Sequence, residues 1–212
     1  MILETILSSL NEDGGVNFAP IGVHVSDHTE LLSEVEEIEI FLYSGSKTFA
    51  NLQARPEGVV NLTDDLLSFV DTALYSGTPP THPSALVRPP RLAGAKLIWE
   101  FAVISFDDSQ EPAKVTGKIL LFRELSSFTG LCRAHGAILE AAITATRLTW
   151  IPASKVTDSW PLWQQVVEKT GGRKEKEAFA KITAYFCKQG IKVRGHTSSL
   201  GIIISYSEEC PH

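Results

Sequence analysis

The chain has 212 residues, 43% hydrophobic and 21% charged, so it is long enough for one large domain or for one domain with a small appendage. Its formal charge of −6 and pI near 5.5, with scattered lysines and arginines, argue against nucleic acid or an anionic membrane as a partner. Three widely spaced cysteines fit neither a disulfide framework nor a zinc ribbon, and no apolar run reaches the roughly 20 residues of a membrane helix, which indicates a soluble cytoplasmic protein.

Six apolar or alternating segments predict β-strands. In chain order they are residues 2–10, 16–25, 36–43, 58–62, 96–106 and 115–123. The first two flank Asp13-Gly14, a dipeptide typical of tight hairpin turns. The third alternates acidic with apolar side chains, which is the period of a strand with one wet face. The sequence therefore predicts six antiparallel strands in the first part of the chain.

Two helical segments and one loop lie between these strands. Residues 46–54 predict a short helical turn that Arg55-Pro56 ends. Asp64 or Asp65 is expected to cap a helix whose apolar stripe reaches Leu74. The proline-rich loop (residues 76–91) holds five prolines, so we expect an extended segment, either a flap over a site or a strap to another subunit.

From Leu131 onward the apolar period becomes helical. One face of the first helix is expected to carry Leu131, Ala134, Ile138, Ala141, Ala142, Ala145 and Leu148. The opposite face carries Arg133, Glu140 and Arg147, either as a solvated or ion-paired surface or as a guard for an anionic substrate. A second helix is expected to begin near Pro161, and a third to cover residues 174–189. Residues 191–193 and 200–206 predict two final strands.

The turn after the third strand concentrates groups that bind anions. Gly45 is followed by Ser46, Lys47 and Thr48, so backbone N–H groups, two hydroxyls and one ammonium can meet a phosphate. On composition alone, an ordinary polar turn is the favoured interpretation. The segment shares the end of a P-loop, but Ile40 stands where that motif needs glycine, which excludes a nucleoside triphosphatase site.

Three stretches resemble the flavin reductases and related proteins of the FMN-binding split-barrel superfamily: residues 17–22, 46–52 and 58–62. The likeness extends to residues 133–148 and points to a branch of archaeal and bacterial flavoproteins, although Cys132 stands where we would expect asparagine. The resemblance implies a mainly β, α+β fold: a six-stranded antiparallel split β-barrel at residues 1–128, with a helical C-terminal part at residues 129–212 packed on the barrel. Closing the strands into a barrel also removes sheet edges that invite aggregation.

The resemblance also implies noncovalently bound FMN. The residues expected at the cofactor are Asn17, Ala19, Pro20, Ile21, Ser46, Lys47, Thr48, Asn51 and Asn61. The hydroxyl and lysine residues with Asn51 would hold the phosphate, and residues 17–21 would lie near the ring. Asn17 and Asn61 have two equally weighted roles, flavin contact or side-chain bonds that tie off turns and strand ends. Ala19 is small and Pro20 lacks an N–H, so the two residues leave space for a flat ring. Both are also ordinary at a strand edge.

Two classes of function stay open from the sequence. No nucleophile triad, carboxylate pair or metal cluster emerges, so any chemistry must come from a cofactor. The first class is an oxidoreductase of flavin-reductase type with an unknown substrate. NAD(P)H would dock on it transiently, because no Gly-x-Gly-x-x-Gly motif follows a strand. The second class is a non-catalytic flavin-binding or assembly protein.

The resemblance implies a homodimer with the flavin near the subunit interface. The proline-rich loop and Trp99 could supply apolar contact surface for a second subunit. Alternatively, the tryptophans fill the core of a single subunit.

Overall fold

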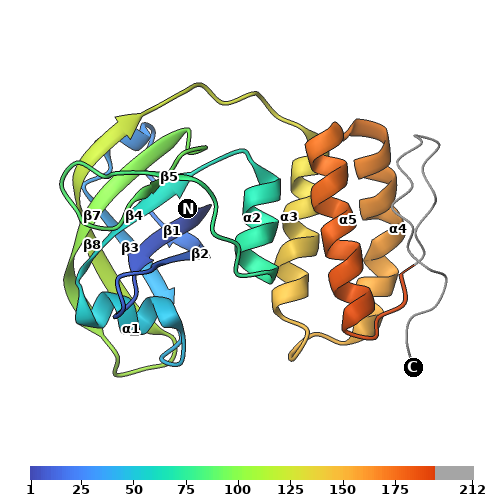
Figure 1. Cartoon of the computed structure of the whole chain (residues 1–212), viewed down its shortest axis with the longest axis horizontal. Helices are drawn as coiled ribbons and strands as arrows, with labels where there is room; N and C mark the ends of the chain where they lie inside the picture. Colours follow the sequence, from blue (N-terminus) through green and yellow to red (C-terminus); the bar gives the residue numbers. More distant parts are fainter. Residues whose placement is uncertain (194–212) are drawn as a thin grey trace. The chain divides into compact units, whose positions relative to one another are not determined.

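The computed structural model describes residues 1–193. The chain divides into two compact units, Met1–Gly130 and Leu131–His212. The first unit is a β-barrel with two helices, and the described part of the second is a bundle of three helices (Figure 1). No helix within residues 1–193 is both long and apolar enough to cross a membrane. The expected packing of the helical part on the barrel stays a prediction.

The barrel has six antiparallel strands in the order β1-β2-β3-β8-β7-β4, and β4 closes the ring by pairing with β1. Their bounds are β1 Ile2–Leu10, β2 Val16–His24, β3 Glu37–Leu42, β4 Glu57–Leu62, β7 Leu97–Asp107 and β8 Ala113–Glu124. This confirms the predicted six-stranded antiparallel barrel.

Alternating residues of the strands fill the barrel interior, and Phe101 of β7 is fully buried among them. The Phe101 ring spans two glycines of the flanking strands: a Cβ on Gly58 would lie 2.7 Å from one ring carbon, and a Cβ on Gly117 would lie 2.6 Å from another. Glycine at these two strand positions therefore makes room for the ring. Trp99 is also fully buried, and its Nε1 donates to the Leu32 carbonyl oxygen (3.2 Å) of a short 3-10 helix, Leu32–Glu34. The expectation that Trp99 contacts a second subunit is wrong, because it fills the core of its own barrel.

Strands β2 and β3 pair over a short stretch only. These two strands pair only at Val23–Ile40 and His24–Glu39 within the described residues. Residues 16–22 of β2 are fully paired with β1 but have no strand partner on the β3 side of the described chain. The barrel is thus split along the β2 edge that was expected to approach the cofactor.

Two helices and the proline-rich loop belong to the barrel unit. Helix α1, Lys47–Ala54, follows β3, and helix α2, Leu66–Leu74, follows β4 with Asp65 as its predicted N-cap. The Asp65 carboxylate accepts a hydrogen bond from the Leu67 N–H at 3.2 Å. The proline-rich loop then carries β5, Thr81–His82, which pairs with β6, Arg91–Leu92.

A buried carboxylate holds the proline-rich loop on the barrel. Glu100 of β7 is 1% exposed, and its two carboxylate oxygens accept hydrogen bonds from three consecutive backbone N–H groups. The donors are Ala85 (2.7 Å), Leu86 (2.5 Å) and Val87 (3.3 Å). A second carboxylate, that of Glu57, binds Arg88 of the same loop at 2.6 Å on the surface. The loop is therefore a strap on its own barrel, fixed at two points.

The second unit contains α3, Arg133–Thr146, α4, Ala153–Thr170, and α5, Arg173–Lys188. The prediction that the second helix begins near Pro161 is wrong, because α4 begins eight residues earlier, at Ala153, and Pro161 lies inside it. Val156, Trp160 and Val167 are all buried on one side of α4, and the Trp160 ring stacks on Phe179 with ring centroids 4.6 Å apart. This packing outweighs the backbone hydrogen bond that an internal proline removes.

Two further predictions for the second unit are corrected. Leu131 precedes α3 and is fully exposed, so it does not belong to the apolar face, whereas Ala134, Ile138 and Ala141 are buried as expected. Residues 191–193 form no strand. They follow the positive-φ Gly190, whose N–H bonds the Cys187 carbonyl oxygen at 2.9 Å to end α5. The strand expected at 200–206 lies outside the described residues.

Candidate anion-binding site

The N-terminus of α1 is formed by the turn that the sequence singles out. Ser46 is the N-cap: its Oγ accepts a hydrogen bond from the Phe49 N–H at 3.2 Å. The N–H groups of Lys47 and Thr48 lie in the same first turn, where a helix offers no carbonyl acceptor. Lys47 is exposed, so its ammonium can approach a ligand at the same end. The turn thus combines helix N–H groups, hydroxyls and one cation, as anion binding requires.

An acidic side chain already binds the preceding N–H group. The Ser44 N–H donates to Glu111 Oε1 at 2.9 Å, and Glu111 comes from the turn between β7 and β8. This N–H is taken, and the Ser46 N–H donates to the Tyr43 carbonyl oxygen at 2.9 Å. The donors left for a ligand therefore include the Ser46 hydroxyl and the N–H groups of Lys47 and Thr48.

Behind the first turn of α1 lies a polar cluster of four side chains, Ser9, Asn17, Thr48 and Asn51. Asn17 Nδ2 donates to Thr48 Oγ1 at 3.0 Å and to Ser9 Oγ at 3.4 Å, and the Asn51 amide lies 3.0 Å from Ser9 Oγ. Ser9, Thr48 and Asn51 expose 1%, 3% and 8% of their surface. The cluster therefore joins α1 to β1 and β2 and brings together three residues that the sequence assigned to the cofactor.

The residues expected near a ring lie on the unpaired stretch of β2. Because side chains alternate along a strand, Asn17 and Ile21 face the barrel interior with Ala19 between them, whereas Pro20 faces the other way. Ala19, Pro20 and Ile21 are each half-buried. A ligand that contacts all three must therefore lie along the strand edge and not on one face of the sheet.

Asn61 has a structural place that uses its whole side chain. It is fully buried on β4, and its Nδ2 donates to the Ile6 carbonyl oxygen and to Ser8 Oγ, both at 2.9 Å. Its Oδ1 accepts from the Leu92 N–H of β6 at 2.8 Å. These bonds join β4 to β1 and β6, which is the structural role considered for Asn61 from the sequence. They also place Asn61 on the opposite face of β1 from the polar cluster.

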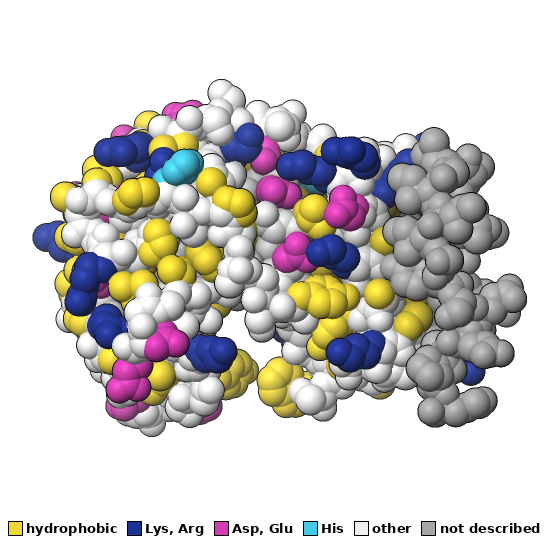
Figure 2. Space-filling view, in the orientation of Figure 1, with side chains coloured by type: hydrophobic (Ala, Val, Ile, Leu, Met, Phe, Trp, Pro, Cys, Tyr) yellow, Lys and Arg dark blue, Asp and Glu magenta, His cyan; other side chains and the backbone are white. Residues whose placement is uncertain are grey.

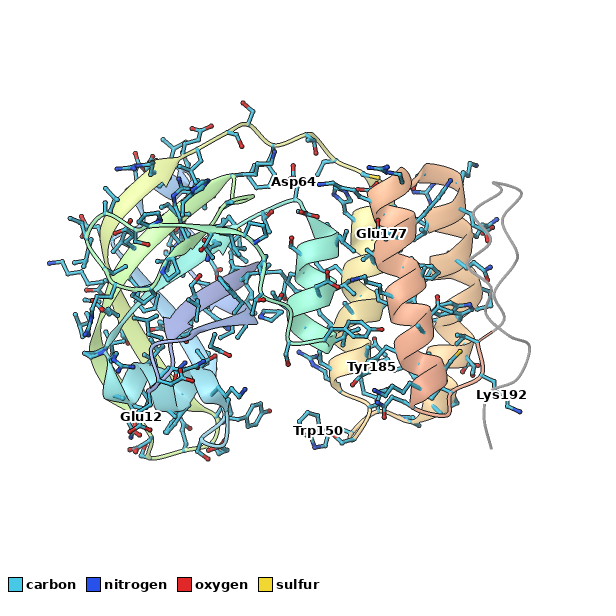
Figure 3. The ribbon with its side chains drawn as sticks, viewed as in Figure 1. Glu12, Asp64, Trp150, Glu177, Tyr185 and Lys192 are labelled. Atoms are coloured by element: carbon cyan, nitrogen blue, oxygen red, sulfur yellow. The ribbon has the colours of Figure 1, made fainter. Side chains whose placement is uncertain are left out.

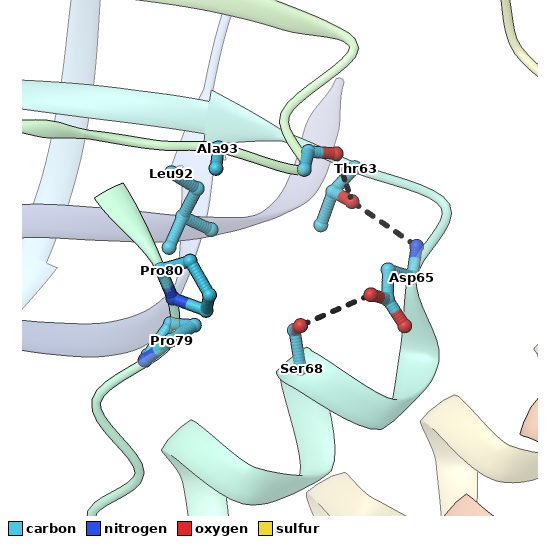
Figure 4. A pocket seen from close by; sticks show the side chains of 8 residues that line it. Thr63, Asp65, Ser68, Pro79, Pro80, Leu92 and Ala93 are labelled. Atoms are coloured by element: carbon cyan, nitrogen blue, oxygen red, sulfur yellow. Dashed lines mark hydrogen bonds between the residues drawn. The ribbon is translucent and has the colours of Figure 1, made fainter. Parts of the chain in front are cut away.

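Two hollows of the described barrel unit lie away from these residues. One, of about 210 Å³, lies between α2 and the proline-rich loop and is lined by Thr63, Asp65, Ser68, Pro79, Pro80, Leu92, Ala93 and Gly94 (Figure 4). A second, of about 370 Å³, is a shallow depression over residues 33–36 and 118–122. The first is smaller than the roughly 300–1,000 Å³ of typical ligand pockets. None of the predicted cofactor residues lines either hollow, so a ligand at α1 would occupy an open surface of one chain.

Asp64, which precedes α2, has a lowered pKa that structural contacts explain. Partial burial would raise the pKa of its carboxyl, but hydrogen bonds from the Thr129 N–H and hydroxyl, each 2.9 Å long, together with the Lys96 ammonium, lower that pKa. Asp64, labelled in Figure 3, thus binds the last residues of the barrel unit to the segment before α2. Within the described residues, no three His, Cys, Asp or Glu side chains gather as metal ligands would.

Three titratable side chains of the second unit make structural hydrogen bonds. Cys132 Sγ donates to the Thr170 carbonyl oxygen at 3.4 Å, and His135 Nε2 lies 3.3 Å from Glu175 Oε1. Glu175 also accepts from the Gly172 N–H at 2.9 Å and so caps α5. Arg133 and Glu140 are exposed on α3, and Arg147, the residue after its last turn, is also exposed. Side chains of both charges are mixed with apolar ones on the face of the molecule that Figure 2 shows. These contacts give α3 no reactive pair.

Sequence reasoning missed two residues at the site. Ser9 lies in an apolar strand and gives no signal of its own, because only its position opposite Asn17 in the β1–β2 register brings it to the cluster. Arg55, read as part of a helix break, donates to the carbonyl oxygens of Asn11 and Glu12 in the β1–β2 hairpin turn beside α1 (Figure 3). The guanidinium thereby fixes the hairpin against α1.

Comparisons with known proteins give family matches over most of the chain. A family described as "Protein of unknown function (DUF447) N-terminal domain" matches residues 3–123, and one described as "Protein of unknown function (DUF447)" matches residues 132–184. The two matches fall in the two units of the structure. No curated protein matches the sequence.

Solved structures are similar to this chain over different shares of its length. An FMN-bound DUF447-family protein of Methanosarcina mazei is 22% identical, with a TM-score of 0.72 over 87% of this chain and 94% of that one. The 2-nitrobenzoate 2-nitroreductase of Pseudomonas fluorescens is 20% identical, with a TM-score of 0.47 over 57% of this chain and 64% of that one. The styrene monooxygenase flavin reductase of Pseudomonas putida S12 is 20% identical, with a TM-score of 0.45 over 57% and 80%.

Proposed function

The chain belongs to the DUF447 family, and from this premise we propose that it is a flavoprotein that binds FMN noncovalently with its phosphate at the N-terminus of α1. The family relative from Methanosarcina mazei was solved as an FMN-bound protein. Lys47, Ser46 and the first N–H groups of α1 hold the phosphate, with Thr48 beneath them. The unpaired edge of β2 at Ala19 and Pro20 lies beside the ring.

The observation that carries this proposal is the donor character of the α1 N-terminus. Ser46 and Thr48 each accept a hydrogen bond from within the protein, from the Phe49 N–H and from Asn17, so each hydroxyl has its proton left to donate. A phosphate offers only acceptors at neutral pH and is stabilised by donors and by the positive end of the helix. Lys47 adds the one positive side chain of this turn.

A homodimer is the second part of the proposal. The α1 site is open on a single chain, and apolar surface continues across the outer face of β1, β2 and β3. Ile2 pairs with His24, whose ring meets the Phe41 ring edge-on with centroids 4.9 Å apart. Ile2 and Phe41 are 55% and 37% exposed. A second subunit on this face would bury these side chains and close the site from solvent.

Sedimentation of the full chain mixed with FMN tests both parts at once. Followed at the protein and flavin absorbance bands, the expected species has twice the chain mass of 23.2 kDa and carries flavin. Flavin that stays behind in solution contradicts FMN binding. Flavin on a species of 23.2 kDa contradicts only the homodimer.

We also propose that the protein is an oxidoreductase of flavin-reductase type that acts in the cytoplasm, with NAD(P)H docking transiently. Bound FMN would supply the hydride or electron transfer, while the chain binds and orients it. Holding the phosphate end at α1 leaves the ring free beside Ala19 and Pro20. The alternative is a flavin-binding or assembly protein without turnover. Ala19, Pro20 and Ile21, the described residues proposed to lie beside the ring, carry no acid or base, which is compatible with this alternative.

Anaerobic stopped-flow mixing separates these two functions. If the protein is an oxidoreductase of this type, NADH or NADPH bleaches the flavin of the loaded protein faster than it bleaches free FMN. A flavin that keeps its absorbance with both donors would establish the binding-protein alternative. Mixing with dithionite serves as the control that the bound flavin can be reduced.

A further inference from the structure

We infer that Ser9 is a positioning residue for the flavin phosphate, an inference that rests on the proposed function. Ser9 is nearly fully buried and does not reach the surface at α1. It acts through Asn17, by fixing which way the Asn17 amide and the Thr48 hydroxyl point. Ser9 thereby makes the α1 N-terminus a site for a phosphate and not merely a polar surface.

The direction of the polar cluster is set at Asn51. With its side-chain nitrogen 3.3 Å from both the Leu10 and the Lys47 carbonyl oxygens, Asn51 donates to two groups that can only accept. In this orientation its side-chain oxygen lies 3.0 Å from both Ser9 Oγ and the Asn11 side-chain amide. It accepts the Ser9 hydroxyl proton, and it accepts from Asn11 when the Asn11 amide turns its nitrogen inward. The two backbone carbonyls therefore favour the orientation in which Ser9 donates toward Asn51.

Each following bond takes its direction from the one before. Because its proton goes to Asn51, Ser9 Oγ can only accept from Asn17, which must turn its Nδ2 inward. The same Nδ2 donates its other proton to Thr48 Oγ1 at 3.0 Å. Thr48 Oγ1 is thus an acceptor on its inner side, and its own proton is directed to the outer side, toward the proposed phosphate.

Without the Ser9 hydroxyl, this order is lost. The Asn17 amide would no longer have an acceptor behind it and could turn over, presenting its oxygen to Thr48. Thr48 would then donate inward and turn a lone pair toward the phosphate, which repels an anion. We expect the change to act on the phosphate end of the ligand, because it is passed from Asn17 to Thr48, and neither Ala19 nor Pro20 belongs to the polar cluster.

A matched control exists in the neighbouring serine. Ser8 is as buried as Ser9, and its Oγ also accepts from an asparagine, Asn61, at 2.9 Å. Because adjacent strand residues face opposite sides, Ser8 lies on the outer face of β1, away from the polar cluster. Ser8→Ala and Ser9→Ala remove the same atom from the same strand but differ in their connection to Thr48.

The test is titration of the full chain with FMN and with riboflavin, which lacks the phosphate. Ser9→Ala is expected to weaken FMN binding by roughly fivefold to tenfold, the size of one net hydrogen bond, and to leave riboflavin binding unchanged. Ser8→Ala is expected to leave the ratio of the two affinities as in the unaltered chain. Ser9→Cys, whose thiol is a weak hydrogen-bonding group, carries the same expectation if Ser9→Ala does not fold.

The outcomes distinguish this inference from the proposed function. An unaltered chain that binds neither ligand contradicts the proposed function itself. If the unaltered chain binds FMN, but Ser9→Ala weakens FMN and riboflavin equally, or affects FMN no more than Ser8→Ala does, the positioning role of Ser9 is overturned. A selective loss of FMN in Ser9→Ala alone supports it.

Discussion

Replacing Lys47 with alanine is expected to weaken FMN binding about 10- to 100-fold, because a charge-assisted hydrogen bond contributes roughly 1.5–3 kcal/mol. Lys47 is exposed in the first turn of α1, at the end of the helix where the backbone N–H groups have no intrahelical acceptor. Loss of the ammonium leaves these N–H groups and the Ser46 hydroxyl to hold the phosphate. The fold should be unaffected, because Lys47 makes no buried contact.

The measurement is the dissociation constant for FMN, obtained from quenching of flavin fluorescence at fixed ionic strength. Lys114→Ala is the matched control, since it removes the same charge from the same barrel. Lys114 Nζ pairs with Glu39 Oε1 at 2.6 Å on the surface, and its loss should change FMN affinity little. Equal losses in the two variants would reveal a general charge effect and argue against a phosphate contact at Lys47.

Glu100→Ala is expected to lower the free energy of unfolding by about 2–4 kcal/mol. The substitution leaves three backbone N–H groups of the proline-rich loop without their acceptor, and one of the three, at Val87, is buried. Ala85 and Leu86 are exposed residues and their hydrogen bonds to Glu100 are only partly buried, so their N–H groups can turn to water, which limits the loss. Glu100→Gln should be nearly as damaging, because an amide nitrogen would then face a backbone donor.

Urea unfolding gives the change in stability, and limited proteolysis shows whether residues 76–91 detach first. Glu57→Ala is the control within the same loop: Glu57 holds Arg88, whose side chain is 65% exposed, and a surface ion pair contributes about 0–1 kcal/mol. If Glu100→Ala is no more destabilising than Glu57→Ala, the buried carboxylate does not anchor the loop.

These two experiments concern different parts of the barrel unit and should be independent. Lys47 lies at the open end of the β2–β3 split, whereas Glu100 lies under the proline-rich loop on the outer face of β7. Glu100→Ala should therefore leave FMN affinity largely unchanged at temperatures where the variant is folded. The proline-rich loop is a strap on its own barrel and takes no part in the proposed phosphate site.

Local patterns in the sequence determined the elements of the barrel. The Asp13-Gly14 turn, the alternation of residues 36–43, the short helix after residue 46 and the Asp65 cap all lie where expected. Each of these signals depends on residues within a few positions of one another, so it can be read without knowing the fold. The turn that we propose as the phosphate site belongs to this group, because Ser46, Lys47 and Thr48 are neighbours in the chain.

Only the tertiary structure decided which distant residues meet. Ser9 and Asn17 become partners through the β1–β2 register, Asn61 faces the other side of β1, and Glu100 reaches a loop about fifteen residues away. Packing likewise overrode a local signal at Pro161, where the stacking of Trp160 keeps α4 continuous. Strand register and side-chain packing are set by the whole barrel and helix bundle, and a shift of one residue would exchange Ser8 for Ser9 behind Thr48.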